Sequence, residues 1–236
     1  MQRTSIEDEE MQEAKPEIIY AFDPLCGWCY GFNPVVTKLR AKFASRAGWR
    51  IMSGGLVTGD RVRPIREMKD YLKNGMSAVT ARTGQQFGEG FLRLLDEGDW
   101  ISRSEPACRA VFVVQREWPN VAMNFAQELC ASFYKAGLKP DEPDTLAVIA
   151  KGCGIDAESL INMWSSEAAL LQTSEEFAHA RLRGITSYPA LYLATEAGIK
   201  CLVEGCASYE QAYVSLLKHI PQLIDTNSTP IKELAI

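Results

Sequence analysis

Two cysteines three positions apart, Cys26 and Cys29, are the residues of this chain best suited to chemistry. The apolar run before them (residues 18–22) predicts a buried strand, and the residues after them, up to about Arg46, have helical periodicity. A cysteine at a helix N-terminus faces unpaired N–H groups and the positive end of the dipole, which stabilise a thiolate. The second cysteine lies about one turn further on, so the pair can interchange between dithiol and disulfide with little backbone movement.

A second candidate feature, Tyr188-Pro189, lies far along the chain and precedes a predicted strand over residues 190–194. A proline is tolerated at the start of a strand because no ladder N–H is needed there. If the bond before Pro189 is cis, the tight turn exposes the backbone of Tyr188.

The remaining cysteines and the two histidines offer little material for a metal site. His179 and His219 have no Cys or His at ligand spacing, and no second Cys-x-x-Cys completes a zinc site, so we expect no metal. The sequence leaves open whether Cys201 and Cys206 form an auxiliary redox pair, because an extended stretch would hold them too far apart unless the chain turns at Gly205. The others are expected to be packing residues: Cys108, Cys130 and Cys153.

Asp23 precedes the cysteine pair by three residues and has two interpretations. It could accept a proton from Cys29, or it could be a turn residue before Pro24. We favour the turn, because Asp before Pro commonly initiates one.

Composition excludes several classes of protein. The chain has 236 residues and a net charge of −5, which argues against a nucleic-acid surface. No apolar run approaches the ~18 residues needed to span a bilayer. The polar N-terminus is unlike a signal peptide, and an odd count of seven cysteines is unlike a secreted disulfide framework. We therefore expect a cytoplasmic protein that binds neither nucleic acid nor membranes.

The pattern along the chain predicts an α/β fold interrupted by helices. Residues 1–16 are expected to be a disordered acidic tail. Residues 17–63 and 166–224 contain a β-α-β unit followed by α-β-β-α, with the last helix running from Tyr209 to Leu223. Residues 64–165 show helical stripes and no strand-like alternation, which predicts an all-helical insertion, and Ser104 is expected to cap one of its helices.

Taken together, the run from Phe22 to Phe32, the helical block and Tyr188-Pro189 resemble the DsbA-like superfamily of thiol–disulfide oxidoreductases, closest to its FrnE-like branch of predicted cytoplasmic protein-disulfide isomerases. The resemblance covers about residues 17–223. It implies a thioredoxin-like fold with a helical insertion.

The resemblance also implies a role for each matching residue. Cys26 would be the exposed nucleophile, Cys29 the buried resolving thiol and Pro189 the cis-proline beside them. The main chain of Tyr188 would pair with an extended substrate peptide. Because unfolded substrates present apolar segments, an apolar rim is expected around the pair from Leu25, Trp28, Phe32 and Tyr188.

The implied function is a protein disulfide reductase or isomerase that acts on protein or peptide thiols and disulfides. Well-known oxidants of the superfamily carry a histidine between the cysteines, whereas this chain has Gly27-Trp28, so we expect a reducing or isomerising enzyme. No resident cofactor is expected, with glutathione left open as electron donor or co-substrate, and a monomer is favoured.

Two other functions remain open. Kappa-class glutathione transferases and hydroxychromenecarboxylate isomerases also insert helices into a thioredoxin fold, but they commonly use a single nucleophile. A non-enzymatic peptide-binding or redox-sensing module would keep the groove without turnover.

Overall fold

The first strand, β1 (Glu17–Ala21), is a central strand of the four-stranded sheet in the computed structural model, which describes residues 15–224. The order of the sheet is β2-β1-β5-β6, with β2 (Gly48–Met52) parallel to β1. The other two strands run antiparallel to their neighbours: β5 (Ala190–Thr195) and β6 (Gly198–Glu204).

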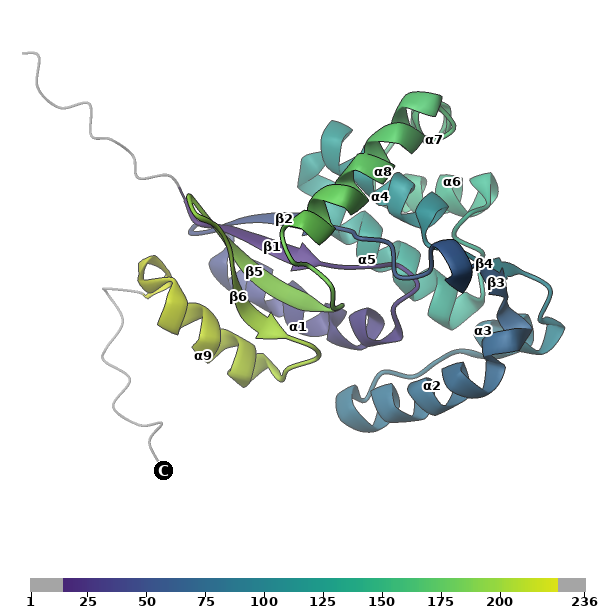
Figure 1. The fold of residues 1–236 in the computed structure, drawn as a ribbon, viewed down its shortest axis with the longest axis horizontal. Coiled ribbons are helices and arrows are strands. Elements are labelled where there is room, and N and C mark those ends of the chain that lie inside the picture. The colour runs from purple at the N-terminus through teal and green to yellow at the C-terminus, as the bar shows by residue number, and fades with distance from the viewer. Residues whose placement is uncertain (1–14, 225–236) are drawn as a thin grey trace, which may run out of the picture.

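The sheet is covered on both faces (Figure 1), which explains why β1 is a continuous apolar run rather than an alternating one. Ile18 and Tyr20 enter the main core, to which α1 (Gly27–Phe43) and α9 (Tyr209–His219) also contribute. Ile19 points to the other face, where a smaller core includes the last turn of α8 (Glu167–Leu182).

The chain between β2 and β5 forms all the described helices other than α1 and α9. In order, the helices before α8 are α2 (Lys69–Thr83), α3 (Glu89–Glu97), α4 (Glu105–Glu117), α5 (Pro119–Ala136), α6 (Pro143–Gly152) and α7 (Ala157–Trp164). Short 3₁₀ turns cover Gly59–Arg61 and Ile65–Met68. None of the helices within residues 15–224 is long and apolar enough to cross a membrane.

The predicted order of elements is confirmed, and three details of the prediction are wrong. The insertion is not entirely helical, because β3 (Arg63–Pro64) pairs with β4 (Ile101–Ser102). The last helix ends at His219, and Pro221 begins a separate 3₁₀ turn over Pro221–Leu223 because proline disfavours a helical residue before it. The Ser104 side chain makes no capping hydrogen bond to α4. Residues 1–14 of the predicted acidic tail lie outside the described residues.

Candidate active site

Cys26 is the N-cap residue of α1, in extended conformation, and its Sγ accepts a hydrogen bond from the backbone N–H of Cys29 at 3.2 Å. One of the unpaired N–H groups at the helix start therefore points at this sulfur. Cys29 is fully buried and Cys26 is 4% exposed, and both are free thiols. Burial, together with the hydrogen bond to Cys26 and its charge, raises the pKa of the Cys29 thiol well above its ordinary value.

The topology of the sheet brings the second candidate feature to the cysteine pair. Because β1 and β5 are antiparallel neighbours and Ala21 pairs with Ala190, the last residue of β1 lies next to the first residue of β5. The bond between Tyr188 and Pro189 is cis, and the Cys26 thiol donates to the Tyr188 carbonyl at 3.5 Å. The cis bond before Pro189, which the sequence left open, is therefore present, and the Tyr188 backbone faces Cys26.

The side chain of Tyr188 needs a glycine beside it. It is packed so closely against Gly54, in the loop after β2, that a Cβ at that position would overlap the phenol oxygen. Gly54 thus makes room for the residue whose carbonyl faces Cys26. No sequence signal connects these positions, because the ring and Gly54 belong to segments more than a hundred residues apart.

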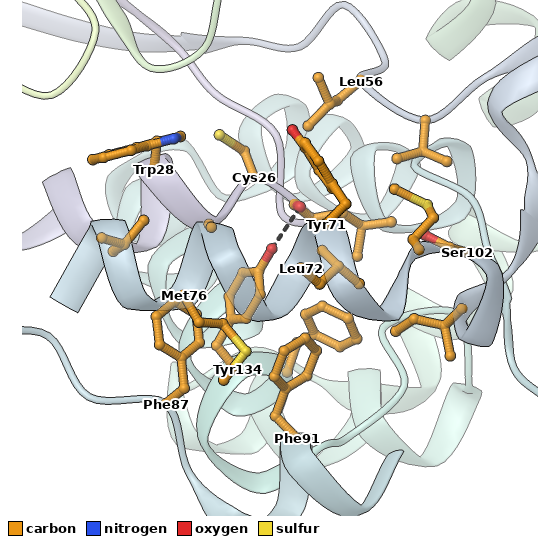
Figure 2. A pocket seen from close by; sticks show the side chains of 18 of the residues that line it. Cys26, Trp28, Leu56, Tyr71, Leu72, Met76, Phe87, Phe91, Ser102 and Tyr134 are labelled. Carbon is orange, nitrogen blue, oxygen red and sulfur yellow. Dashed lines mark hydrogen bonds between the residues drawn. The ribbon is translucent and has the colours of Figure 1, made fainter. Parts of the chain in front are cut away.

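An apolar cavity of about 530 Å³ opens beside Cys26 and extends toward the insertion. Figure 2 shows Cys26 and Trp28 at one end and Leu72 and Met76 of α2 along it, with an aromatic group that includes Tyr134 beneath. Tyr134 donates a hydrogen bond to the Leu25 carbonyl at 2.6 Å and so links α5 to the residue before Cys26.

Three of the four residues expected to form an apolar rim line this cavity: Leu25, Trp28 and Tyr188. Trp28 is the most accessible, with 37% of its surface exposed. The prediction for Phe32 is wrong. Its side chain is fully buried and packs edge-on against Tyr20 beneath the sheet, so it faces the core and not a substrate.

The Asp23 side chain behaves as the turn residue that we favoured. Its Oδ1 accepts from the backbone N–H of Leu25 at 2.9 Å, and the Asp23 carbonyl accepts from the N–H of Cys26 at 3.0 Å. The carboxylate also reaches residues that the sequence did not connect with it, since Ser104 of the insertion donates to Oδ1 at 3.0 Å.

Outside the pair, Cys108 and Cys130 are buried packing residues as expected, and Cys153 is partly buried. Cys201 is exposed and Cys206 partly buried, and both are free thiols. Within residues 15–224 no group of three or more His, Cys, Asp and Glu side chains could hold a metal ion.

Comparisons with known proteins identify the family to which this fold belongs. The model of the DSBA-like thioredoxin domain matches residues 17–212. A proposed protein disulfide isomerase from Nitrosomonas europaea has a similar structure, with a TM-score of 0.76, 25% identity, and coverage of 89% of this chain and 99% of that one. The cytosolic disulfide reductase DsbM from Pseudomonas aeruginosa has a TM-score of 0.66 and 21% identity, with coverage of 79% of this chain and 88% of that one. DsbM has also been solved with glutathione.

Among curated proteins, the ClpXP adapter protein SpxH of Bacillus subtilis is 22% identical over 207 residues. The alignment covers 83% of this chain but only 65% of that protein, less than two thirds of its length. Since the family model spans most of the chain, from β1 into α9, the chain belongs to the family of the DSBA-like thioredoxin domain.

Proposed function

We propose that this protein is a protein disulfide reductase or isomerase that exchanges disulfides through Cys26 and Cys29. The observation that carries the proposal is the arrangement of the two thiols. One caps the first turn of α1 beside the cis-proline loop, and the other lies buried one turn further on, with its N–H on the first sulfur.

The proposed exchange has two steps. The Cys26 thiolate attacks one sulfur of a substrate disulfide, forms a mixed disulfide and expels the other substrate sulfur as a thiolate. The Cys29 thiol then loses its proton and its sulfur attacks Cys26 Sγ, which releases the second substrate thiolate and leaves the Cys26–Cys29 disulfide. The substrate gains two electrons in this exchange. Two molecules of a low-molecular-weight thiol such as glutathione then reduce the Cys26–Cys29 disulfide and are themselves oxidised to a disulfide.

The surroundings of the pair support a peptide-like substrate. The Tyr188 backbone beside Cys26 is suited to pair with an extended chain, which is the role we propose for it and Pro189. The apolar cavity has room for a large side chain next to the substrate cysteine. Glutathione as electron donor is supported by the DsbM structure solved with it. The cytoplasmic location, the monomeric state and membership of the FrnE-like branch stay predictions.

A second candidate is a binding protein without turnover, favoured by the similarity to a protein named as an adapter. A glutathione-dependent transferase or isomerase has less support, because such enzymes commonly need one nucleophile and this site holds two thiols in contact.

The test is the reduction of a disulfide-linked peptide, with a tryptophan beside its cysteine, at the expense of glutathione. We expect Cys26→Ser to abolish turnover. We expect Cys29→Ser to complete the first step and then accumulate a mixed disulfide on Cys26, identified by mass spectrometry. Cys201→Ser, which removes an exposed thiol outside the site, is the matched control and should turn over like the wild type.

Two results would contradict the proposal. Full turnover by Cys29→Ser would indicate a single-nucleophile enzyme, and peptide binding by the wild type without any turnover would indicate the binding protein.

A further inference from the structure

The helix α2 carries an apolar stripe that faces the cavity beside Cys26. Met68, which precedes the helix, and Leu72, Met76 and Val79 recur at helical spacing, and all four line the cavity. Val79 is the only buried residue of α2, so most of this stripe is not covered by protein. Because such a stripe normally packs against a core, the space next to it is suited to an apolar occupant.

The C-terminal part of α2 is packed closely against α1. A Cβ added to Gly31 of α1 would lie 2.9 Å from the side chain of Val79 and 3.0 Å from that of Thr83. Gly75, in the middle of α2, also lines the cavity, and a Cβ added there would meet no other atom within 4 Å. The helix is therefore held at one end, while the space beside its middle is open.

The wall of the cavity beneath α2 consists of aromatic rings. Figure 2 shows Phe87, Phe91 and Tyr134 below Leu72 and Met76. Tyr134 packs edge to face against Phe87 and Phe91, with ring centroids 5.3 and 4.9 Å apart. The volume of about 530 Å³ lies within the roughly 300–1,000 Å³ of typical ligand pockets. Adaptable aliphatic side chains on one wall and rings on the other suit a large apolar side chain.

Two arginines of the insertion line the same cavity. Arg61 and Arg63 are exposed, and no ion pair in the described part of the chain includes either of them. Arg63 donates to the backbone carbonyl of Asp60 at 2.7 Å. Among the described lining residues, Glu67 alone carries a carboxylate. An apolar cavity lined by two cations and one anion fits an occupant that is apolar in one part and anionic in another.

We infer that this cavity selects protein substrates in which a large apolar side chain neighbours the cysteine and an acidic residue follows that side chain. The α2 stripe and the rings bind the apolar side chain, and Arg61 and Arg63 bind the acidic residue. The inference rests on the proposed function, because Cys26 lines the same cavity and would form the mixed disulfide at its edge. The apolar contact supplies most of the selectivity, since exposed charge pairs contribute little and are screened by salt.

The experiment measures kcat/KM for the reduction of disulfide-linked peptides by the full chain, with glutathione as the final reductant. The peptides carry Trp or Ala next to the cysteine and Asp or Lys beyond it, and this pair is placed in turn on each side of the cysteine. In each turnover the peptide disulfide is reduced to two thiols, and two glutathione molecules are oxidised to glutathione disulfide. The rate without enzyme is subtracted.

Filling the cavity tests the apolar part. Leu72→Trp fills it from α2, and Ala78→Trp, at an exposed position of the same helix outside the cavity, is the matched control. We expect the wild type and Ala78→Trp to prefer Trp over Ala peptides about tenfold or more on at least one side of the cysteine. Leu72→Trp should reduce the preference to within about twofold by slowing the Trp peptides more. If it fails to fold, Gly75→Leu fills the same cavity from a position with open space.

Removing the two arginine charges tests the anionic part. We expect the wild type to reduce Asp peptides about two- to fivefold faster than Lys peptides at low salt. This ratio should approach one in the double variant Arg61→Gln/Arg63→Gln and, for the wild type, at high salt. The double variant should keep its preference for Trp, because the apolar walls are unchanged. Arg181→Gln/Arg183→Gln removes two exposed charges outside the cavity and should behave like the wild type.

Equal rates with Trp and Ala peptides on both sides of the cysteine would overturn the inference, as would a preference that the filling variants leave unchanged. Equal rates with Asp and Lys peptides at low salt would overturn the role of the arginines. Binding of a free aromatic acid such as naphthoate, without any preference among peptides, would assign the cavity to a small molecule instead. Failure of the proposed function is a separate result, because the wild type would then reduce none of the peptides.

Discussion

At the scale of single residues, the two thiols of the site differ in how they meet solvent. Cys26 faces the cavity and a backbone N–H, whereas Cys29 is sealed in the core with its pKa raised by burial. In the proposed exchange we therefore expect the buried thiol to keep its proton until a mixed disulfide has formed on Cys26. This order suits a reductase, because the resolving thiol is protected from other oxidants.

The carboxyl of Glu176, a partly buried residue of α8, predicts how the stability of the protein depends on pH. Its Oε1 accepts from the Ser53 N–H at 3.1 Å, and burial raises its pKa from 4.5 to about 7. Below pH 4.5 both the folded and the unfolded chain hold the proton. Between pH 4.5 and 7 only the unfolded chain releases it, so stability falls as the pH rises.

Glu176→Gln should remove that loss, because Gln stays neutral and keeps the acceptor for Ser53. We expect the variant to be more stable than the wild type by about 2 kcal/mol at pH 8 and equal to it at pH 4, measured by urea unfolding. Equal stability at pH 8 would show that the carboxyl ionises in the folded protein at no cost.

Sequence reasoning at this scale identified the residues defined by local pattern. The cysteine pair and Tyr188-Pro189 stand out by spacing and by position against a strand or helix. Phe32 was misplaced because an apolar residue near a motif has no sequence signal for which side of its helix faces the core. The cavity residues of α2 and the Gly54 contact were missed, since both depend on long-range packing.

At the scale of elements, glycines within helices reveal where the insertion is tightly packed. Gly90, in the first turn of α3, meets the end of α5, and a Cβ there would overlap the backbone carbonyl of Ala136. Gly75, in the middle of α2, has open space around the position of a Cβ. The same substitution should therefore have opposite effects at the two sites.

We expect Gly75→Ala to stabilise the protein by about 0.5–1 kcal/mol, because alanine favours helix. Gly90→Ala should destabilise it by about 1–3 kcal/mol or more, because backbone atoms must move apart. Urea unfolding of both variants measures the two changes under one condition. Loss of stability in the first variant, or none in the second, would contradict this packing.

The elements themselves were largely predictable, for a physical reason. Apolar stripes at helical spacing depend on each helix burying one face, which holds wherever the helix lies. The β3–β4 pair has only two residues in each strand, too short for any alternation to be visible. Ser104 has the residue type of a cap, but its hydroxyl is used by Asp23 and by the Val57 N–H at 2.9 Å.

At the scale of the whole molecule, the fold assembles the site from distant parts of the chain. Antiparallel pairing of β1 with β5 brings the cysteine pair, which follows β1, next to the cis-proline loop, which precedes β5, and the insertion closes the cavity beside them. The sequence could indicate this meeting only through resemblance to a family, because spacing alone does not tell which strands pair.

The most direct test of the account is equilibration of the purified wild type with defined ratios of reduced and oxidised glutathione, followed by alkylation and mass spectrometry. We predict one reversible two-electron transition between the dithiol and the Cys26–Cys29 disulfide, with a midpoint in the reducing range. A stable glutathione adduct on Cys26, without a disulfide to Cys29 at any ratio, would contradict the central claim and favour a single-nucleophile glutathione enzyme.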